Sequence, residues 1–249
     1  MVLREYAGRS SYHALQLSLN QRLQHGVTVD YYYAYAKSLA YYGADSSNSG
    51  DATVQDANNI ANSYGPKISD LRHTETLVAS YTLPTTSFAG KSRLAAGFLS
   101  GWNLQGIQTA RSGLPINVLA GRDEAGINTT GFQRPDLVPG VNQYIENLNS
   151  MQWLNAAAFD SKAPAAQFRY GNLGYNALRG PSAFTFDFAL HKAFHVHEKQ
   201  TLTFRAEAFN FLNHKKLNLP ITSLANPSFG LITSGGDGRN VQLALKYLF

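Results

Sequence analysis

The sequence contains no cysteine among its 249 residues. Disulfide frameworks, thiolate metal sites and enzymes with a cysteine nucleophile are therefore excluded. Charged residues are also scarce: they make up 15% of the chain, whereas a soluble globular domain carries about 25%. No apolar run is long enough for a transmembrane helix, so a helical membrane protein is not expected.

Clusters of basic residues are lacking as well. The formal net charge is +5, a balance that can favour nucleic acid or an anionic membrane surface. The longest basic run is Lys215-Lys216, and basic residues do not alternate with aromatic ones on a periodic face. We therefore expect no nucleic-acid partner. The first residues lead directly into polar sequence without an apolar segment, which predicts no signal peptide.

Aromatic residues are abundant, and much of the chain alternates between apolar and polar side chains. There are 14 tyrosines and 14 phenylalanines. Seven segments have the period of two that is typical of a strand with one apolar face. They cover residues 11–24, 27–38, 70–83, 102–117, 182–196, 200–213 and 239–249.

The opposite faces of these strands carry polar and charged residues, as the wall of a water-filled lumen would. The residues that we expect to face such a lumen are Asn20, Arg22, Asp30, Asp187, His191, Arg205 and Glu207. Lys192 interrupts the apolar face of its strand. A long lysine stem can lie along an apolar surface and carry its charge to an interface.

The connections between the predicted strands differ in length in a regular way. Short turns fall at His25-Gly26 and near Glu198-Lys199, and a medium connection runs from Pro84 to about Arg93. Long loops occupy roughly residues 39–69, 118–181 and 214–237. Transmembrane β-barrels have short periplasmic turns and long extracellular loops, whereas loops longer than about 15 residues are uncommon in compact domains.

These patterns predict an all-β fold, an antiparallel transmembrane β-barrel segment of about seven strands, with its long loops outside the cell. The whole chain, residues 1–249, is expected to form one partial barrel domain. A soluble β-sandwich that binds carbohydrate is the remaining alternative, because such a sandwich also has strands with one apolar face.

The register of the first hairpin can be predicted from its alternation alone. Apolar residues are odd-numbered on both strands, so facing residues must have numbers with an even sum. The nearest fit pairs Leu23 with Val27 and Asn20 with Asp30. Gly26 then ends a three-residue loop, in the left-handed conformation that glycine adopts at least cost.

No catalytic or metal-binding group is evident. His191 and His195 share a strand face but lie about 13 Å apart, too far to hold one ion. Ser112 lacks the glycine pattern of a nucleophile elbow. We therefore expect no enzymatic activity, no metal and no cofactor.

Two acidic or glycine-rich stretches in the loops are expected to be ordinary. Asp123, Glu124 and Asp136 lack the spacing of a calcium loop, and we expect them to be solvated carboxylates. Residues 235–238 are rich in glycine but do not precede a helix, so they do not form a phosphate cradle. A flexible loop is expected there.

Several segments of the sequence resemble the C-terminal barrel of Oar-like TonB-dependent outer-membrane receptors. This is the type with a carboxypeptidase-regulatory-like N-terminal domain that is common in acidobacterial genomes. The most specific segment is FRAEAFNFLNH, which follows LRGP. The other segments are SSYHALQLSLNQRLQHGVTVDYYYAYAKS, SDLRHTETLVASYTLP, GWNLQGIQTARSGLPINV, LRGPSAFTFDFALHKAF and the closing GRNVQLALKYLF. Together the resemblance covers the chain from about Ser10 to Phe249.

The resemblance implies a function that no single motif reveals. A complete receptor of this type takes up a large ligand across the outer membrane, and its barrel has about 22 strands. This chain would supply the last seven strands, the barrel wall and ligand-facing loops. We expect the plug, the TonB box and a signal peptide to be absent from it, so that the TonB complex would act only through that missing N-terminal plug.

The resemblance also implies a location and partners. The chain is expected in the outer membrane of a Gram-negative bacterium, in contact with outer-membrane lipid and with the barrel-assembly machinery. The ligand cannot be read from the sequence. The last strand resembles the signal that this machinery recognises, and its residues are Val241, Leu243, Leu245, Tyr247 and Phe249. A complete small outer-membrane barrel or an adhesin-like surface protein remains the alternative, although single-chain bacterial barrels have even strand numbers.

Overall fold

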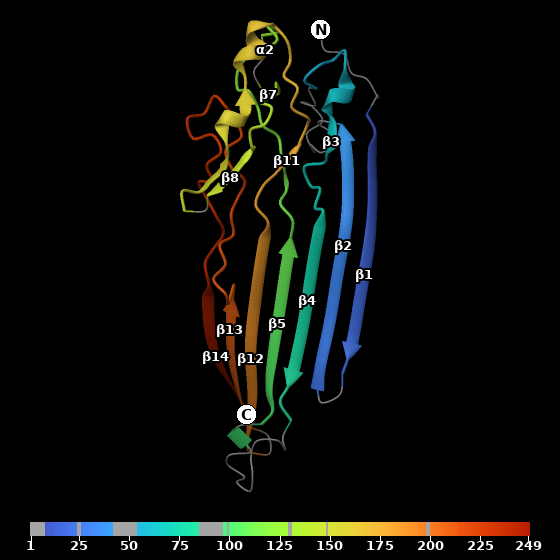
Figure 1. Cartoon of the computed structure of the whole chain (residues 1–249). Coiled ribbons are helices and arrows are strands. Elements are labelled where there is room, and N and C mark those ends of the chain that lie inside the picture. The colour runs from blue at the N-terminus through green and yellow to red at the C-terminus, as the bar shows by residue number, and fades with distance from the viewer. Residues whose placement is uncertain are drawn as a thin grey trace.

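The protein forms one large antiparallel sheet with folded loops at one end, as shown in the computed structural model (Figure 1). The structure describes residues 8–23, 26–41, 54–84, 97–98, 100–128, 131–147, 149–197 and 200–249. The long strands are β1 (Ser10–Arg22), β2 (Val27–Tyr41), β4 (His73–Thr82), β5 (Trp102–Arg111), β12 (Ala183–His197), β13 (Gln200–Phe209) and β14 (Asn240–Leu248). They lie side by side in the order β1-β2-β4-β5-β12-β13-β14. The short strand β3 (Tyr64–Pro66) extends the sheet beside β2.

The seven predicted strands are all present, and the fold is all-β as expected. Two strands end clearly earlier than the sequence pattern indicated: β13 ends at Phe209 rather than near residue 213, and β5 ends at Arg111 rather than near residue 117. Gly113 follows, and a side chain there would lie 1.8 Å from the carbonyl oxygen of Gly180. Glycine therefore permits two backbone segments to meet where the sheet ends and the loops begin.

The registers of the six strand pairs put most of the apolar residues of the seven strands on the same face of the sheet, whereas Val78 and Ile107 pair on the other face. Leu17 pairs with Tyr33, and three strands further on Leu190 pairs with Leu104 and with Ala206. Because facing residues share a face, one register error would move the apolar residues of a whole strand to the other side. We call the side that carries Leu190 the apolar face and the opposite side the polar face.

Aromatic rings form a band at each end of the apolar face. Near the short turns, Trp102 lies edge-on to Phe194 and to Phe204, with ring centroids 6.4 and 6.0 Å apart. Near the loops, Phe211 packs against Phe186 and Phe188, at 6.2 and 5.6 Å. Two aromatic girdles that flank an apolar band are typical of strands that span an outer membrane.

The predicted register of the first hairpin is confirmed. Asn20 pairs with Asp30, and the backbone N–H of Leu23 donates to the carbonyl oxygen of Val27 at 2.8 Å. Gly26 has a φ of 81°, the left-handed conformation that was expected. The other two residues of the predicted turn, 24 and 25, lie outside the described residues.

Lys192 lies on the apolar face, yet the residue is only 5% exposed. Its ammonium group donates to the carbonyl oxygen of Ser100 and lies 5.3 Å from the centroid of the Phe194 ring. The stem runs along the apolar surface as predicted, and the charge ends against backbone at the turn end of the sheet. Most of the medium connection predicted from residue 84 lies outside the described residues.

The long loops are folded, which the sequence did not predict. The described residues of 54–72, 112–182 and 210–239 pack together at one end of the sheet and are called the loop layer below (Figure 1). Its short elements are η2 (Ile60–Ser63), β6 (Pro115–Ile116), β7 (Asp136–Leu137), β8 (Tyr144–Asn147), β9 (Gln152–Leu154), η3 (Ala156–Ala158), β10 (Phe159–Asp160), α2 (Lys162–Ala166) and β11 (Leu178–Arg179). None of the helices described in the structure is long and apolar enough to cross a membrane.

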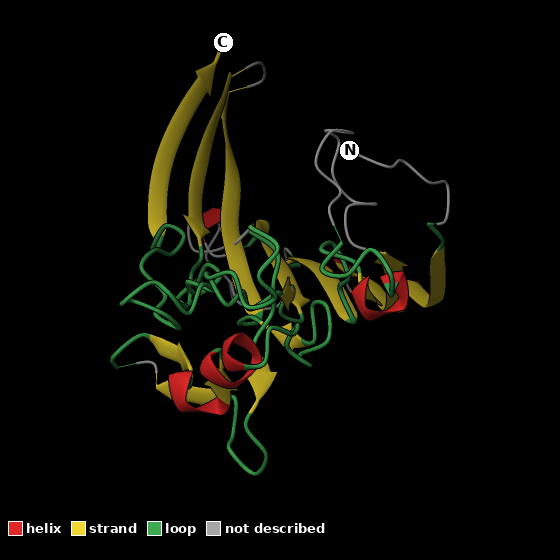
Figure 2. Ribbon diagram, turned by 90° about the horizontal axis from the view of Figure 1, so that it is seen from above, coloured by secondary structure: helices red, strands yellow, loops and turns green. Residues whose placement is uncertain are grey.

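The sheet is open between β1 and β14. Neither strand has a second partner among the described residues, and the two edges lie well apart (Figure 2). Both strands run from the loop layer toward the turn end, because Ser10 pairs with Ala40 and Phe209 with Asn240 at the loop end. The described residues place no second sheet over the apolar face.

The first prediction concerns the hairpin turn. A β-carbon on Gly26 would lie 3.1 Å from the carbonyl oxygen of Thr82, and the residue is left-handed. Gly26→Val should therefore destabilise the folded protein by about 1 kcal/mol or more. Gly26→Asn should cost less, because asparagine tolerates this conformation. The measurement is the temperature at which the folded, heat-modifiable band disappears when isolated outer membranes are analysed by gel electrophoresis.

The matched control is Gly131→Ala, because a β-carbon there meets nothing within 4 Å and the residue is not left-handed. It should leave the transition temperature unchanged. If Gly26→Val had the same transition temperature as the control, a side chain at this position of the turn would cause no strain.

Candidate functional site

The predicted lumen residues lie on the polar face and fall into two groups. Asn20, Arg22 and Asp30 are on β1 and β2, whereas the other four are on β12 and β13. The registers bring His191 opposite Arg205. That this face lines a lumen stays a prediction, because the open sheet encloses no interior.

The first group contains a hydrogen-bonded trio. The Asn20 amide nitrogen donates to the Asp30 carboxylate at 2.8 Å and to the Tyr32 hydroxyl at 2.9 Å. The pairing of Asn20 with Asp30 across the strands makes this contact possible. Arg22 pairs with Thr28 instead and adds a separate positive charge near the turn.

The second group is built around the carboxylate of Glu207. The Arg205 guanidinium and the Gln242 amide both donate to it, and His191 Nε2 lies 3.4 Å from the same carboxylate. Arg205 is half exposed, so this ion pair remains in contact with water. Asp187 is not part of this cluster; its carboxylate accepts the backbone N–H of Asn210 at 2.7 Å, at the start of the loop layer.

Cavities open on the polar face, most of them bordered by residues of the loop layer. Four of them have volumes of about 370, 420, 460 and 800 Å³. The largest is lined by Asp187 and Asn210 from the sheet side and by Lys216, Asp237 and Arg239 from the third loop. Its lining therefore offers both signs of charge and amide groups to a polar ligand. The described residues contain no group of three or more His, Asp or Glu side chains that could hold a metal ion.

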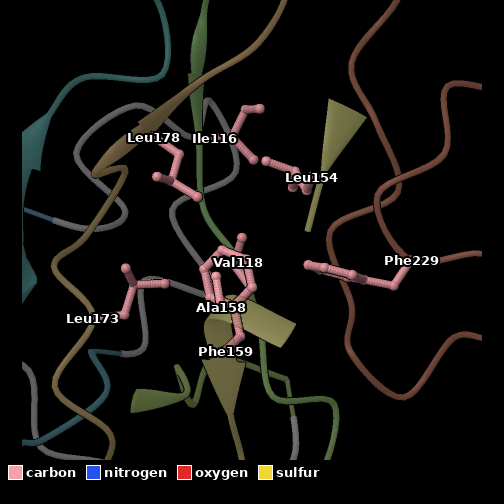
Figure 3. Packing of buried hydrophobic residues seen from close by; sticks show 8 residues of the cluster. All are labelled: Ile116, Val118, Leu154, Ala158, Phe159, Leu173, Leu178 and Phe229. Atoms are coloured by element: carbon pink, nitrogen blue, oxygen red, sulfur yellow. The ribbon is translucent and has the colours of Figure 1, made fainter. Parts of the chain in front are cut away.

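The loop layer has a hydrophobic core of its own (Figure 3). The core residues come from the second and third long loops, and they are Ile116, Val118, Leu154, Ala158, Phe159, Leu173, Leu178 and Phe229. Phe159 and Phe229 meet edge to face with centroids 5.6 Å apart. The bridge between Leu119 and Ser223 joins the same two loops. Because these loops share a core, they form one packed body over the cavities.

Buried polar links attach the first long loop to this body. The side chain of Arg134, which is 2% exposed, donates to the carbonyl oxygens of Leu173 at 2.8 Å and Asn62 at 2.7 Å. Gln55 accepts the backbone N–H of Arg134 at 3.0 Å and donates to the carbonyl oxygen of Gly171 at 3.1 Å. Such contacts satisfy buried backbone groups that lie outside regular structure.

Asp70 and Arg179 connect the loop layer to the sheet. The Asp70 side chain has no exposed surface, and its carboxylate accepts the Arg179 guanidinium and the backbone N–H of Ser38. Arg179 also donates to the Asp70 and Gly113 carbonyl oxygens, at 2.7 and 3.2 Å. Burial disfavours the charged form of Asp70, but these donors outweigh it and hold the pKa of Asp70 below its usual range.

The loop carboxylates are not all solvated, and that expectation was wrong. Glu124 is completely buried, and burial, with Asp136 as a second cause, raises its pKa to about 7. Asp136 accepts both terminal nitrogens of Arg169, at 3.0 and 2.6 Å, which lowers the pKa of Asp136.

The glycine run at residues 235–238 has defined partners instead of the expected flexible course. Gly235 forms a bridge with Leu217. The backbone N–H of Gly236 donates to the carbonyl oxygen of Lys216 at 2.8 Å. A β-carbon at Gly235 would lie 2.5 Å from that same oxygen. Glycine there permits the close approach of the two segments that form the rim of the largest cavity.

Comparison with known families identifies the kind of protein that this sheet belongs to. Residues 1–242 match the outer membrane beta barrel domain family, and the chain therefore belongs to it. Comparison with curated proteins and with solved structures finds no match. The protein is an outer-membrane β-barrel protein of a Gram-negative bacterium, as the sequence analysis predicted. We accordingly expect the apolar face with its two aromatic girdles to face lipid.

The second prediction concerns the link between Asp70 and Arg179. Arg179→Met should leave the buried Asp70 carboxylate without its main partner and destabilise the loop layer by about 3 kcal/mol. The pKa of Asp70 is lowered in the folded protein, so the link to Arg179 stabilises the loop layer fully above pH 3.8, the usual pKa of an aspartate. Its contribution is lost only as the pH falls below that value. Hydrogen exchange of residues 112–118 and 176–182 in isolated outer membranes measures the effect.

Arg169→Met is the matched control, because it removes an arginine–aspartate pair whose arginine side chain is 39% exposed. Such a pair contributes about 1 kcal/mol or less. Equal exchange rates in the two variants would contradict a structural role for the buried link.

Proposed function

We propose that the chain forms the C-terminal part of the barrel of an Oar-like TonB-dependent receptor, which takes up a ligand across the outer membrane. In this proposal the seven long strands are the last of about 22. The role of the chain is passive and not enzymatic: it supplies wall, lumen surface and ligand-facing loops. The resemblance of FRAEAFNFLNH and its neighbouring segments to that family supports the assignment.

The observation that carries the proposal is the pair of open sheet edges. β1 and β14 run in the same direction, and neither has a second partner among the described residues. Exposed strand edges are not tolerated in hydrocarbon, so both edges need partners in the membrane. Since neighbouring strands of an antiparallel barrel alternate in direction, the additional strands must be odd in number.

The need for an odd number of additional strands argues against two simpler assemblies, a complete small barrel and a ring of two copies of the chain. A complete small barrel made only of these strands would have to pair β1 with β14 in parallel, and so would a ring of two copies of the chain. The first additional strand would begin at the turn end of the sheet, on the periplasmic side. A periplasmic plug ahead of that strand, through which the TonB complex would act, fits this direction.

The loop layer and the cavities fit the same role. The layer lies at the outer end of the strands, and the cavity of about 800 Å³ opens below it on the polar face. In the complete receptor this cavity would lie at the outer mouth of the lumen. The last strand, together with Phe249 directly after it, is proposed as the segment that the barrel-assembly machinery recognises.

The third prediction tests the need for further strands. The chain expressed alone with a periplasmic targeting sequence should aggregate or stay bound to assembly factors. Co-expression with the segment encoded directly upstream should give a heat-modifiable outer-membrane protein, because the two open edges are then paired. That upstream DNA should encode a plug domain in frame.

A monodisperse, heat-modifiable monomer of the chain alone in detergent would contradict the proposal and favour a complete small barrel. An upstream reading frame without a plug domain would contradict the assignment to TonB-dependent receptors and leave the barrel itself intact.

A further inference from the structure

Glu124 is a buried carboxylic acid without a hydrogen-bonding partner, in the part of the loop layer formed by residues 118–136. The residue has no exposed surface, and neither carboxylate oxygen accepts a hydrogen bond in the structure. Its neighbour Asp123 is the opposite case. The Asp123 carboxylate accepts the Gln133 amide at 2.8 Å and the backbone N–H groups of Ile127 and Asn128 at 3.1 and 2.7 Å.

The conformation of the local backbone explains why the Asp123 carboxylate is surrounded by hydrogen-bond donors whereas the Glu124 carboxylate has none. Gln133 Oε1 accepts the backbone N–H groups of Glu124 at 2.6 Å and Ala125 at 2.9 Å. The Ala120 N–H donates to the Gln133 carbonyl oxygen at 2.8 Å. Gln133 thus holds the turn from both sides, and the Glu124 side chain is directed into the layer while Asp123 caps the turn that follows.

This turn joins two of the long loops. Gly121 is left-handed, and a β-carbon there would lie 2.6 Å from the β-carbon of Ala225 in the third loop. The N–H of Leu119 donates to the carbonyl oxygen of Thr222 at 3.0 Å, and the N–H of Leu224 donates back to Leu119 at 2.9 Å. The residues just before Glu124 are therefore in direct contact with residues 222–225 of the third loop.

Charges of both signs act on Glu124. Asp136 and Asp160 disfavour its ionisation, whereas Arg122 and Arg169 favour it. Arg169 already donates to both carboxylate oxygens of Asp136. Burial therefore remains the dominant cause of the raised pKa, which is about 7. A buried carboxylate without a hydrogen-bond donor is costly, whereas the neutral acid is tolerated.

We propose that Glu124 is a proton-controlled latch that holds the second and third loops together while its carboxyl group is protonated. Ionisation draws the carboxylate toward water and loosens residues 118–136 from residues 222–225. The loop layer is thus closed at acid pH and more open at neutral to alkaline pH. This inference depends only on the loop layer and not on the proposed transport function.

The direction of the pH dependence follows from the raised pKa. An acid whose pKa is higher in the folded state than its usual 4.5 binds its proton more strongly when the layer is closed. The closed layer is therefore most stable below pH 4.5. Its stability decreases as the pH rises from 4.5 to about 7 and becomes independent of this group above that value.

Hydrogen exchange of the protein in isolated outer membranes tests the latch. Rates in residues 118–136 and 222–225 are compared between wild type and Glu124→Gln at each pH, which cancels the intrinsic pH dependence of exchange. Between pH 5 and pH 8, the wild type should lose at least about tenfold in protection relative to Glu124→Gln. The closed layer binds the Glu124 proton more tightly than the open layer does, and release of this proton over that range removes the stability that it adds. Glu124→Met, an apolar replacement of similar size, should also abolish the pH dependence.

Asp56→Asn removes another carboxylate of the loop layer and should keep the wild-type response. A loss of protection that is equally large in Glu124→Gln would overturn the proposal, because another group would then be responsible. Protection that calcium chloride restores at pH 8 in the wild type alone would overturn it as well, since Glu124 would then be a cation ligand.

Discussion

Continuous backbone pairing in one register is the constraint on which this structure depends. In hydrocarbon every backbone N–H and C=O group must be paired within the protein, and the six strand pairings achieve this for the interior of the sheet. The same pairings keep most of the apolar residues of the seven strands on one side. Pairs such as Leu17 with Tyr33 and Leu190 with Leu104 are thus both packing contacts and determinants of which surface meets lipid.

The loop layer is stabilised by different interactions from those of the sheet. We expect it to lie outside the lipid region, where it can form a conventional hydrophobic core and bury charged groups that are paired. Arg134 and the Asp70–Arg179 link replace regular secondary structure as partners for the backbone. The layer covers the cavities on the polar face, and Glu124 makes its stability depend on pH.

The sequence predicted the sheet well because alternation is a local property. Strand positions, the face of each residue and the turn at Gly26 could all be obtained from neighbouring residues. The loop layer could not be predicted in this way. Asp70 and Arg179 are 109 residues apart and belong to no periodic pattern, and Glu124 was expected to be solvated because its burial depends on segments distant in sequence. The lumen role of the polar face remains a prediction.

Cysteine labelling along β13 tests the central claim, that one face of the sheet meets lipid and the other meets water. The chain has no native cysteine, so Phe204→Cys, Arg205→Cys, Ala206→Cys and Glu207→Cys can each be examined alone in isolated outer membranes. A charged, water-soluble maleimide should label Arg205→Cys and Glu207→Cys, whereas the other two should react only with a lipid-soluble reagent. Labelling that does not alternate, or that alternates in the opposite sense, would contradict this account.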